Sequence, residues 1–411
     1  MKRLINLIIV LSLYQNLCFG QTNNSIDSST NQINIGIRDQ VYSQILGEER
    51  EVLIHVPESR IYGLKYPVIY LLDGEFHFES VYGIMRSNAI SRLIPEMIIV
   101  AIPNTDRYRD LSTSHIGDDS NSSGGAENFT KFITNELIPY VDSTYPTVSH
   151  RTLIGHSLGG LVVVNALLNH STFFDNYLAI DPSLGWDNQK LLNEGRLQVK
   201  EGNYENKALY VAIANTINNG KLTDMNFEDA LKDTTTATLH LRSIHEFSEL
   251  AKSNDQLASK WKYYPDETHG TVPIVAEHHA LRFLFSWFKF EDWDEFYAPE
   301  PKLSGKELVG LIESHFNIIS EKLGYTYLPE EYEINRLAYM FLGRNDFERA
   351  FPFFELNVKN YPDSPNSYDS IGDYYISISD SANAIKCLSK SLELGGVDGT
   401  KQKLEELKKG K

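Results

Sequence analysis

The stretch "RTLIGHSLGGLVV", residues 151–163, decides how the rest of the chain is interpreted. An apolar run that suits a buried strand leads into a G-x-S-x-G motif centred on Ser157, and an apolar run that suits a helix follows. A serine at such a turn is held in a strained backbone conformation that lifts its hydroxyl above the sheet, while the glycines leave room for neighbouring backbones. We therefore predict that Ser157 is a nucleophile; the alternative is a glycine-rich turn without chemistry.

Short runs rich in Val, Ile, Leu and Tyr recur between residues 33 and 292 and alternate with helical patterns. Most lack polar alternation, as is typical of strands buried on both faces of a parallel sheet. These runs are "PVIYLLDG" (67–74), "MIIVAIPN" (97–104), "RTLIGHS" (151–157), "NYLAIDPS" (176–183), "ALYVAIAN" (208–215) and "WKYYP" (261–265). Two earlier runs joined at Gly47 predict an antiparallel pair. The alternation of strands and helices predicts an α/β domain over 33–292 with a mostly parallel sheet.

A second, all-α domain is expected at residues 305–411, after a proline-containing and charged linker at 293–304. Its pattern repeats with a spacing of 34 residues, which relates Leu337 to Ile371. This spacing resembles that of tetratricopeptide helix pairs. Because two copies are fewer than such arrays usually need, we expect the first helix of the region or the α/β domain to cap them.

The composition limits the classes of partner. A chain of 411 residues is too long for one ordinary core, which favours two domains. Its 55 acidic and 38 basic residues give a formal charge of −17, which disfavours nucleic acid and anionic membrane surfaces as partners. No Cys/His cluster has the spacing of a zinc site, so no metal or cofactor is predicted.

The first residues have the pattern of an export signal. Two basic residues precede the apolar run 4–13, which is too short to span a bilayer, and Gly20 ends a segment suited to signal peptidase. We predict a signal peptide at 1–20 and a polar, flexible linker at 21–32, with a periplasmic or secreted product and no membrane span after cleavage. A retained anchor and lipidation of Cys18 are alternatives, although a bulky residue before Cys18 argues against lipidation.

A serine hydroxyl needs a base to take its proton. His269 follows the last predicted strand in "DETHGTVP", where a catalytic histidine comes in folds of this kind; a structural histidine is the alternative. The acid is expected after the run 208–215, but that run ends in Asn215 without a carboxylate. The candidates in the next segment, in order of preference, are Asp224, Asp233 and Glu228. A Ser–His pair without an acid also stays open.

Further site residues follow from the loops after the strands. The oxyanion donors are expected to be the backbone N–H groups of Leu158, directly after the nucleophile, and of Glu75, in "LLDGEFHF"; for Glu75 an ordinary loop amide is the alternative. Arg107 and Arg109 come to the edge of the sheet where ligands bind and suit an anionic substrate group, unless they form salt bridges with neighbouring aspartates. Trp186 is either a wall of the substrate pocket or core packing.

Taken together, these segments resemble the esterase branch of the α/β-hydrolases, which includes enterochelin esterases, S-formylglutathione hydrolases, feruloyl esterases and mycolyltransferases. The matching segments cover about residues 50–290 and are "YPVIYLLDGEFHF", "IPNTDRYRDLSTSH", "FITNELIPYVDSTYP", "LIGHSLGGL", "DPSLGWDN" and "DETHGTVP". The enterochelin-esterase-like subgroup is the most similar. The resemblance implies an α/β-hydrolase sandwich with Ser157 as nucleophile, His269 as base, and oxyanion donors at Glu75 and Leu158. The chain departs from the family pattern in the position of the acid and in its C-terminal helices.

The function expected from these features is that of an exported serine esterase acting through an acyl-enzyme. Its small-molecule substrate would be a siderophore ester, an acylated or feruloylated sugar, or a small acyl ester. One alternative is an acyltransferase on the same scaffold. Another is a catalytically degenerate binding protein whose helical repeats hold a protein partner, an interpretation motivated by the missing acid.

Overall fold

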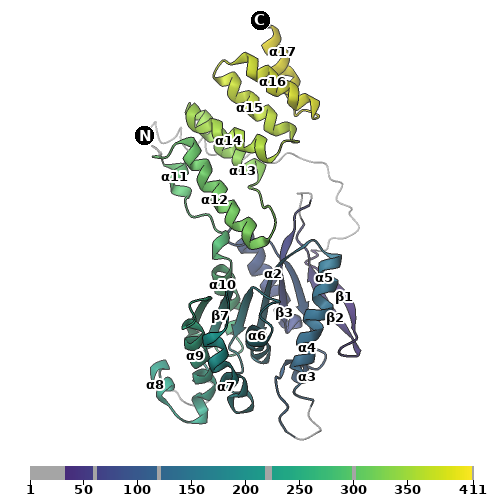
Figure 1. Ribbon diagram of the computed structural model, residues 1–411, viewed down its shortest axis with the longest axis vertical. Coiled ribbons are helices and arrows are strands. Elements are labelled where there is room, and N and C mark those ends of the chain that lie inside the picture. Colours follow the sequence, from purple (N-terminus) through teal and green to yellow (C-terminus); the bar gives the residue numbers. More distant parts are fainter. Residues whose placement is uncertain (1–32, 59–62, 118–121, 218–224, 299–301, 410–411) are drawn as a thin grey trace. The chain divides into compact units, whose positions relative to one another are not determined.

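A computed structural model describes residues 33–58, 63–117, 122–217, 225–298 and 302–409 (Figure 1). The predicted signal peptide at 1–20, the linker at 21–32 and Asp224 lie outside the described residues. Across the described ranges, none of the helices combines the length and apolarity needed to cross a bilayer.

The described residues form one eight-stranded sheet with the strand order β1-β2-β4-β3-β5-β6-β7-β8. The first two pairings, β1 with β2 and β2 with β4, are antiparallel, and all the others are parallel. The strands are β1 (Ile37–Ser43), β2 (Glu48–His55), β3 (Tyr66–Leu72), β4 (Ile98–Ile102), β5 (Thr147–His156), β6 (Asn176–Ile180), β7 (Lys207–Ala214) and β8 (Leu257–Tyr264). The predicted α/β class and mostly parallel sheet are confirmed.

The burial of the strands explains why their sequences lack alternation. Every residue of β3, β4 and β6 is buried, because helices cover both faces of the sheet at these positions. At the edge of the sheet, β8 alternates buried or half-buried residues with exposed ones, as a strand covered on one face does.

Two groups of helices cover the sheet (Figure 1). In one group, α2 (Gly74–Ile90) packs against α10 (Val272–Leu284). In the other, α6 (Leu158–Asn169) contacts α3 (Arg107–Leu111), α4 (Ala126–Phe132) and α7 (Trp186–Glu201). The remaining helices of this part are α5 (Ile138–Thr144), which continues α4 through a π-helical turn at Ile133–Leu137, α8 (Phe227–Lys232) and α9 (Leu239–Lys252).

The C-terminal part is all-helical, as predicted (Figure 1). Its helices are α12 (Gly305–Leu323), α13 (Glu331–Gly343), α14 (Phe347–Asn360), α15 (Pro365–Ser377), α16 (Ser381–Glu393) and α17 (Thr400–Lys409). The 34-residue spacing of the sequence is preserved in the starting residues of α13 and α15 and of α14 and α16. Within the segment expected to be a linker, α11 (Trp293–Tyr297) places Phe296 fully buried in the same apolar cluster as α12 and α13.

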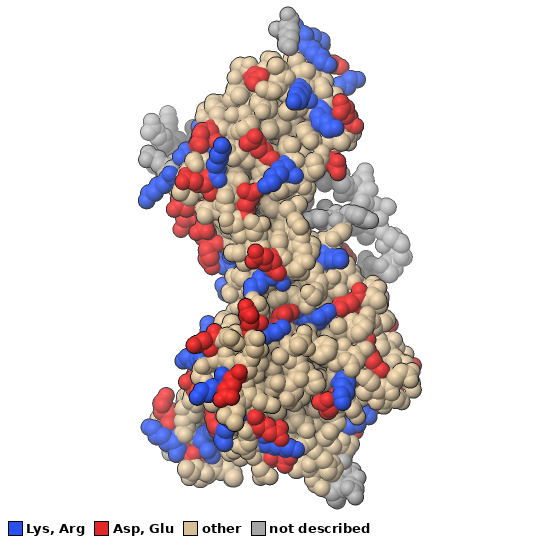
Figure 2. Space-filling view, viewed as in Figure 1, with Lys and Arg blue, Asp and Glu red and all other residues tan. Residues whose placement is uncertain are grey.

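Acidic and basic side chains alternate over the face drawn in Figure 2. Ion pairs between exposed side chains of the described residues include Arg196 with Glu246 at 2.7 Å and Lys359 with Glu313 at 2.6 Å. On this face the excess of acidic residues is therefore distributed rather than gathered into one patch.

Candidate active site

Ser157 lies at a sharp turn between the end of β5 and the start of α6. Its backbone has φ 60° and ψ −113°, a conformation that non-glycine residues rarely adopt. The turn is fixed by the Ser157 N–H, which donates to the Ile180 carbonyl at 2.9 Å, and by the Ser157 carbonyl, which accepts from the Ser183 N–H at 2.9 Å. The turn places the serine at the carboxyl end of β5, as the G-x-S-x-G motif predicts.

The glycines of the motif are required by close backbone approach. A Cβ atom on Gly155 would lie 2.4 Å from the backbone of Gly159, and one on Gly160 would lie 2.9 Å from Pro182 Cα. Neither backbone contact can be relieved by turning a flexible side chain. The motif is therefore a packing requirement of the strand, the turn and the helix, in addition to its chemical interest.

His269 lies beside the Ser157 turn. Its ring centroid is 4.5 Å from that of His156, the residue before the serine. Its Nδ1 lies 2.5 Å from Oδ2 of Asp181, so the carboxylate accepts the Nδ1 proton and leaves Nε2 free to act as a base. The Ser157 hydroxyl lies 3.2 Å from Ser183 Oγ, and across the described residues it makes no hydrogen bond to His269. Catalytic hydrogen bonds are often formed only with substrate bound.

Asp181 is the carboxylate next to His269, a residue that the sequence analysis did not consider as the acid. It directly follows β6, its side chain is fully buried, and its φ of 41° is another strained value for a non-glycine residue. Its Oδ1 accepts from the Ala214 N–H at 2.9 Å, and its Oδ2 also contacts His240 Nε2 at 3.0 Å. Burial alone would raise the pKa of Asp181, but hydrogen bonds from His240, His269 and Ala214 hold it below its ordinary value. The carboxylate is therefore ionised at neutral pH.

The acids predicted from sequence do not occupy this position. Asp233 instead accepts hydrogen bonds from Thr235 Oγ1 at 2.5 Å and Thr238 Oγ1 at 2.8 Å, so its carboxylate stabilises the turn before α9. Glu228 is in the first turn of α8, and Asp224 is not described. The carboxylate that contacts His269 is that of Asp181, and that of Asp233 is bonded to threonines instead. The sequence signal was present in "NYLAIDPS", where an aspartate ends the strand that neighbours the serine strand.

The two predicted oxyanion donors belong to the first turns of neighbouring helices. Leu158 begins α6 and Glu75 is the second residue of α2, and first-turn amides have no acceptor within their own helix. The two turns are adjacent, since a Cβ atom on Gly159 would lie 3.2 Å from Asp73 Oδ2. Asp73, the N-cap of α2, has φ 54°, so a third strained residue stands at this edge of the sheet.

Residues 43–272 match the sequence family described as "Putative esterase". The chain belongs to this esterase family. It is 29% identical over 243 residues to "Ferri-bacillibactin esterase BesA" of Bacillus subtilis, an alignment that covers 53% of this chain and 78% of that protein. The chain spans about half the length of two fungal siderophore esterases that it also matches. Its class is therefore that of a serine-type carboxylic ester hydrolase.

Solved structures agree with this assignment of the esterase. An IroE-like serine hydrolase from Shewanella oneidensis is 28% identical, with a TM-score of 0.62, over 78% of this chain and 98% of that one. An uncharacterised protein from Capnocytophaga ochracea is 17% identical, with a TM-score of 0.65, over 91% of this chain and 99% of that one. The second shares the fold alone, and its longer match extends the shared architecture beyond the residues of the family match.

Of the two arginines predicted to bind substrate, only Arg107 lines the small cavity next to the catalytic loops of the esterase. Its guanidinium is held by both carboxylate oxygens of Asp73, at 2.6 and 3.0 Å. Arg109 instead binds Glu48 at 2.6 Å and Asp110 at 2.6 Å, in a network with the buried Arg50. Arg109 therefore stabilises the fold, and its predicted role in substrate binding is not supported by its position.

The small cavity has a volume of about 290 Å³. Its lining residues are Asp73, Phe76, His77, Arg107, His156, Gly270 and Pro273. Trp186 is not among them: its indole N–H donates to Ser114, and its ring contacts the edge of Tyr108 with centroids 5.2 Å apart. Trp186 therefore does not form a wall of this cavity. Its contacts with Ser114 and Tyr108 suit packing, the alternative that the sequence left open.

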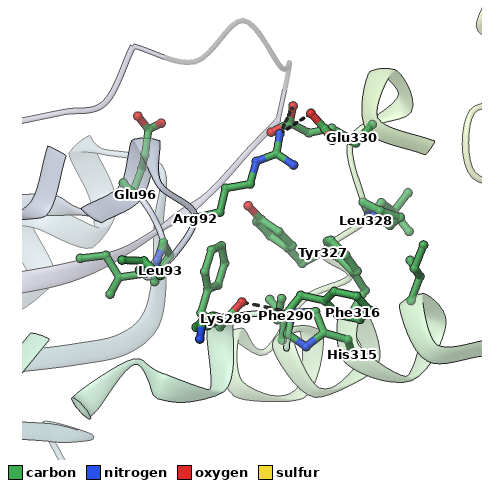
Figure 3. Close-up of a pocket in the computed structure, with 18 of the residues that line it drawn as sticks. Arg92, Leu93, Glu96, Lys289, Phe290, His315, Phe316, Tyr327, Leu328 and Glu330 are labelled. Atoms are coloured by element: carbon green, nitrogen blue, oxygen red, sulfur yellow. Dashed lines mark hydrogen bonds and ion pairs between the residues drawn. The ribbon is translucent and has the colours of Figure 1, made fainter. Parts of the chain in front are cut away.

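A larger cavity of about 870 Å³ lies elsewhere in the esterase, where Tyr66 begins β3 and helices α12 and α13 contribute their side chains (Figure 3). Aromatic side chains gather in it, among them Phe290, Phe316 and Tyr327, and Arg92 reaches Glu333 at 2.8 Å. Ser157, Asp181 and His269 follow the carboxyl ends of strands, whereas this cavity adjoins an amino end. Its size therefore does not make it the catalytic pocket.

A metal ion is not needed to explain the catalytic cluster. Asp181, His240 and His269 each offer one ligand atom, and these atoms lie within 4.8 Å of one another. Hydrogen bonds account for the same distances, because the two imidazoles both contact the carboxylate oxygen. The arrangement suits proton transfer from a serine hydroxyl.

Proposed function

We propose that the esterase hydrolyses a siderophore ester through an acyl-enzyme on Ser157, with His269 as general base and Asp181 as the orienting acid. The observation that carries this proposal is the 2.5 Å contact between His269 Nδ1 and Asp181 Oδ2, beside the strained turn of Ser157. A buried carboxylate at Nδ1 selects the tautomer whose Nε2 accepts the serine proton. The siderophore class is supported by the similarity to ferri-bacillibactin esterase and to siderophore triacetylfusarinine C esterase.

The proposed steps follow from this geometry. His269 Nε2 takes the Ser157 proton while Oγ attacks the ester carbonyl, and Asp181 stabilises the resulting imidazolium. The N–H groups of Leu158 and Glu75 stabilise the tetrahedral oxyanion. The imidazolium then protonates the leaving alcohol, and water, activated by the same histidine, releases the acid. No cofactor takes part in these steps.

The proposed location and domain division follow from the sequence. We infer export by the signal at 1–20, with the product in the periplasm or the medium. We also infer an esterase domain at 33–292 and a tetratricopeptide-like domain at 305–411 that offers a surface for a protein partner. Sequencing the N-terminus of the protein in each cell fraction tests export. Unprocessed protein found only in the cytoplasm would contradict it.

The first experiment compares wild type with Ser157→Ala on p-nitrophenyl acetate, butyrate and octanoate. We expect Ser157→Ala to lower kcat by about 10⁴-fold or more, because the nucleophile is lost. The oxyanion donors and substrate binding remain and account for the residual rate. Ser143→Ala, which removes an exposed hydroxyl bonded to Tyr140, is the matched control and should keep full activity. A Ser157→Ala variant with the wild-type rate would overturn the mechanism.

A second experiment addresses the substrate class and the acyltransferase alternative. Ferric and iron-free triester siderophores, a feruloylated sugar and a short acyl ester are compared by kcat/KM, with products identified by mass spectrometry. A preference for the siderophore esters supports the proposal, whereas preference for the sugar ester overturns the substrate class alone. Added alcohols that capture most of the acyl group would favour the acyltransferase. The contact between Asp181 and His269 supports an enzyme over the degenerate binding protein, because that alternative was motivated by the lack of an acid.

A further inference from the structure

Asp181 serves two histidines through one oxygen atom. His269 Nδ1 lies 2.5 Å and His240 Nε2 lies 3.0 Å from the same Oδ2, while Oδ1 accepts from the Ala214 N–H. His240 is the second residue of α9, and its side chain is 30% exposed, against 0% for Asp181. A Ser–His–Asp mechanism needs only one of these imidazoles, so His240 requires a separate explanation.

We propose that His240 is a positioning residue of the esterase, which holds the Asp181 carboxylate in place and takes part of its negative charge from His269. This inference rests on the proposed function, since it assigns a role to a neighbour of the proposed acid. His240 touches neither Ser157 nor the small cavity in the described contacts, so it acts through Asp181.

The first consequence concerns geometry. The backbone of Asp181 is strained, and the Ala214 N–H donates to only one of its carboxylate oxygens. A donor from α9 to the second oxygen restricts rotation of the carboxylate, which keeps it in line with His269 Nδ1. Removing a donor from a fully buried carboxylate also destabilises its ionised form. Without His240, the acid would be held less firmly and would orient His269 less well.

The second consequence concerns the basicity of His269. An oxygen that accepts from two imidazoles stabilises the imidazolium of His269 less than an undivided oxygen does. The rings of His240 and His269 are 5.6 Å apart, so a protonated His240 also opposes protonation of His269. Both effects weaken the stabilisation that the Asp181 carboxylate gives to the imidazolium of His269.

Other titratable groups near this cluster are present in wild type and in the His240 variants alike. The ring of His156 is tilted relative to that of His269, with centroids 4.5 Å apart, and the ring of His77 from α2 lies 5.9 Å from that of His156. Asp73, which is bonded to Arg107, contributes negative charge near His156. A comparison of variants at residue 240 alone therefore isolates the contribution of His240 to the pH profile.

The test measures kcat, KM and the pH profile of kcat/KM for His240→Ala and His240→Gln, with p-nitrophenyl butyrate as the probe. We expect His240→Ala to lower kcat by about tenfold or more with little change in KM, because a hydrogen bond to a charged group is lost. The acidic limb should move to higher pH. His240→Gln keeps an N–H donor without a titrating charge, so it should recover kcat, with an acidic limb between those of wild type and His240→Ala.

The matched control is His245→Ala on the same helix, because His245 packs against Phe227 and Trp261 instead of Asp181. Wild-type kcat and an unshifted limb in both His240 variants would overturn the inference. So would a loss of kcat that His240→Gln does not recover at all, since a merely structural role predicts that result. If His240→Ala does not fold, His240→Gln still decides through the limb. An active Ser157→Ala would instead overturn the proposed function itself.

Discussion

The neighbouring strands β6 and β7 end differently from what the sequence predicted, because the carboxylate expected after β7 follows β6 instead. Asp181 after β6 provides the carboxylate for His269, whereas Asn215 after β7 provides none. Asn215 braces the loop that carries His269 instead: its N–H donates to the Glu267 carbonyl and its Nδ2 to the Pro265 carbonyl, both at 2.7 Å.

A strand end near His269 can therefore supply either a charge or structural support. The two strand ends are joined directly, since the Ala214 N–H donates to Asp181 Oδ1. The end of β7 therefore supports the acid of β6 as well as the loop of His269. An acid can be moved to the adjacent strand because both strand ends open on the same edge of the sheet.

The largest expected effect is that of Asp181→Asn, which removes the charge from β6. We expect kcat to fall by about 10³- to 10⁴-fold, because an amide favours the wrong tautomer of His269 and cannot stabilise its imidazolium. Steady-state kinetics on an activated ester measures the effect, with circular dichroism to check folding. A folded variant within tenfold of the wild-type kcat would show that Asp181 is not the acid.

The converse substitution, Asn215→Asp, tests whether the end of β7 can take over the charge. We expect it to lower kcat by about tenfold, because a carboxylate cannot donate to the Pro265 carbonyl and the loop of His269 loses a hydrogen bond. In the Asp181→Asn background it should give no rescue. Recovery of activity in the double variant would mean that either strand end can supply the acid.

The fold could be predicted because its signals are local. The runs that became β3, β4 and β6 are apolar throughout since helices cover both faces, and the glycines around Ser157 are needed for backbone contact. His269 was predicted because it follows the last strand, and in the structure it contacts Asp181. The segment after residue 292 was harder to predict from sequence. It was expected to be a linker, but α11 within it contributes Phe296 to the apolar cluster of the C-terminal helices.

The remaining site residues depend on contacts between distant segments. Arg107 and Arg109 are two positions apart on the short helix α3, so they point in different directions, and only Arg107 reaches the cavity. His240 reaches Asp181 from 59 residues further along the chain. Neither the pairing of Arg109 with Glu48 nor that of His240 with Asp181 has a spacing that sequence alone reveals.

A smaller effect is expected from His156, which stands between the serine turn and His269. Burial, together with the charges of His269 and His77, lowers the pKa of His156 to about 4. The unfolded chain binds its proton near pH 6.5, so stability falls as the pH drops from about 6.5 towards 4. Between pH 7 and pH 5, the free energy of unfolding should therefore fall by about 1–2 kcal/mol less in His156→Gln than in wild type. Urea unfolding at both pH values measures this, and equal losses would contradict the assignment.

The smallest expected effect is that of Asp233→Ala, at the acid position first favoured among the described residues. Its carboxylate is bonded to Thr235 and Thr238, so the substitution should loosen the turn before α9 and lower the melting temperature slightly. We expect kcat to stay within about twofold of wild type, as for surface changes away from a site. The contrast with Asp181→Asn separates a carboxylate that stabilises a turn from one that orients a base. A large loss of kcat in Asp233→Ala would mean that the turn before α9, and with it His240, transmits its position to Asp181.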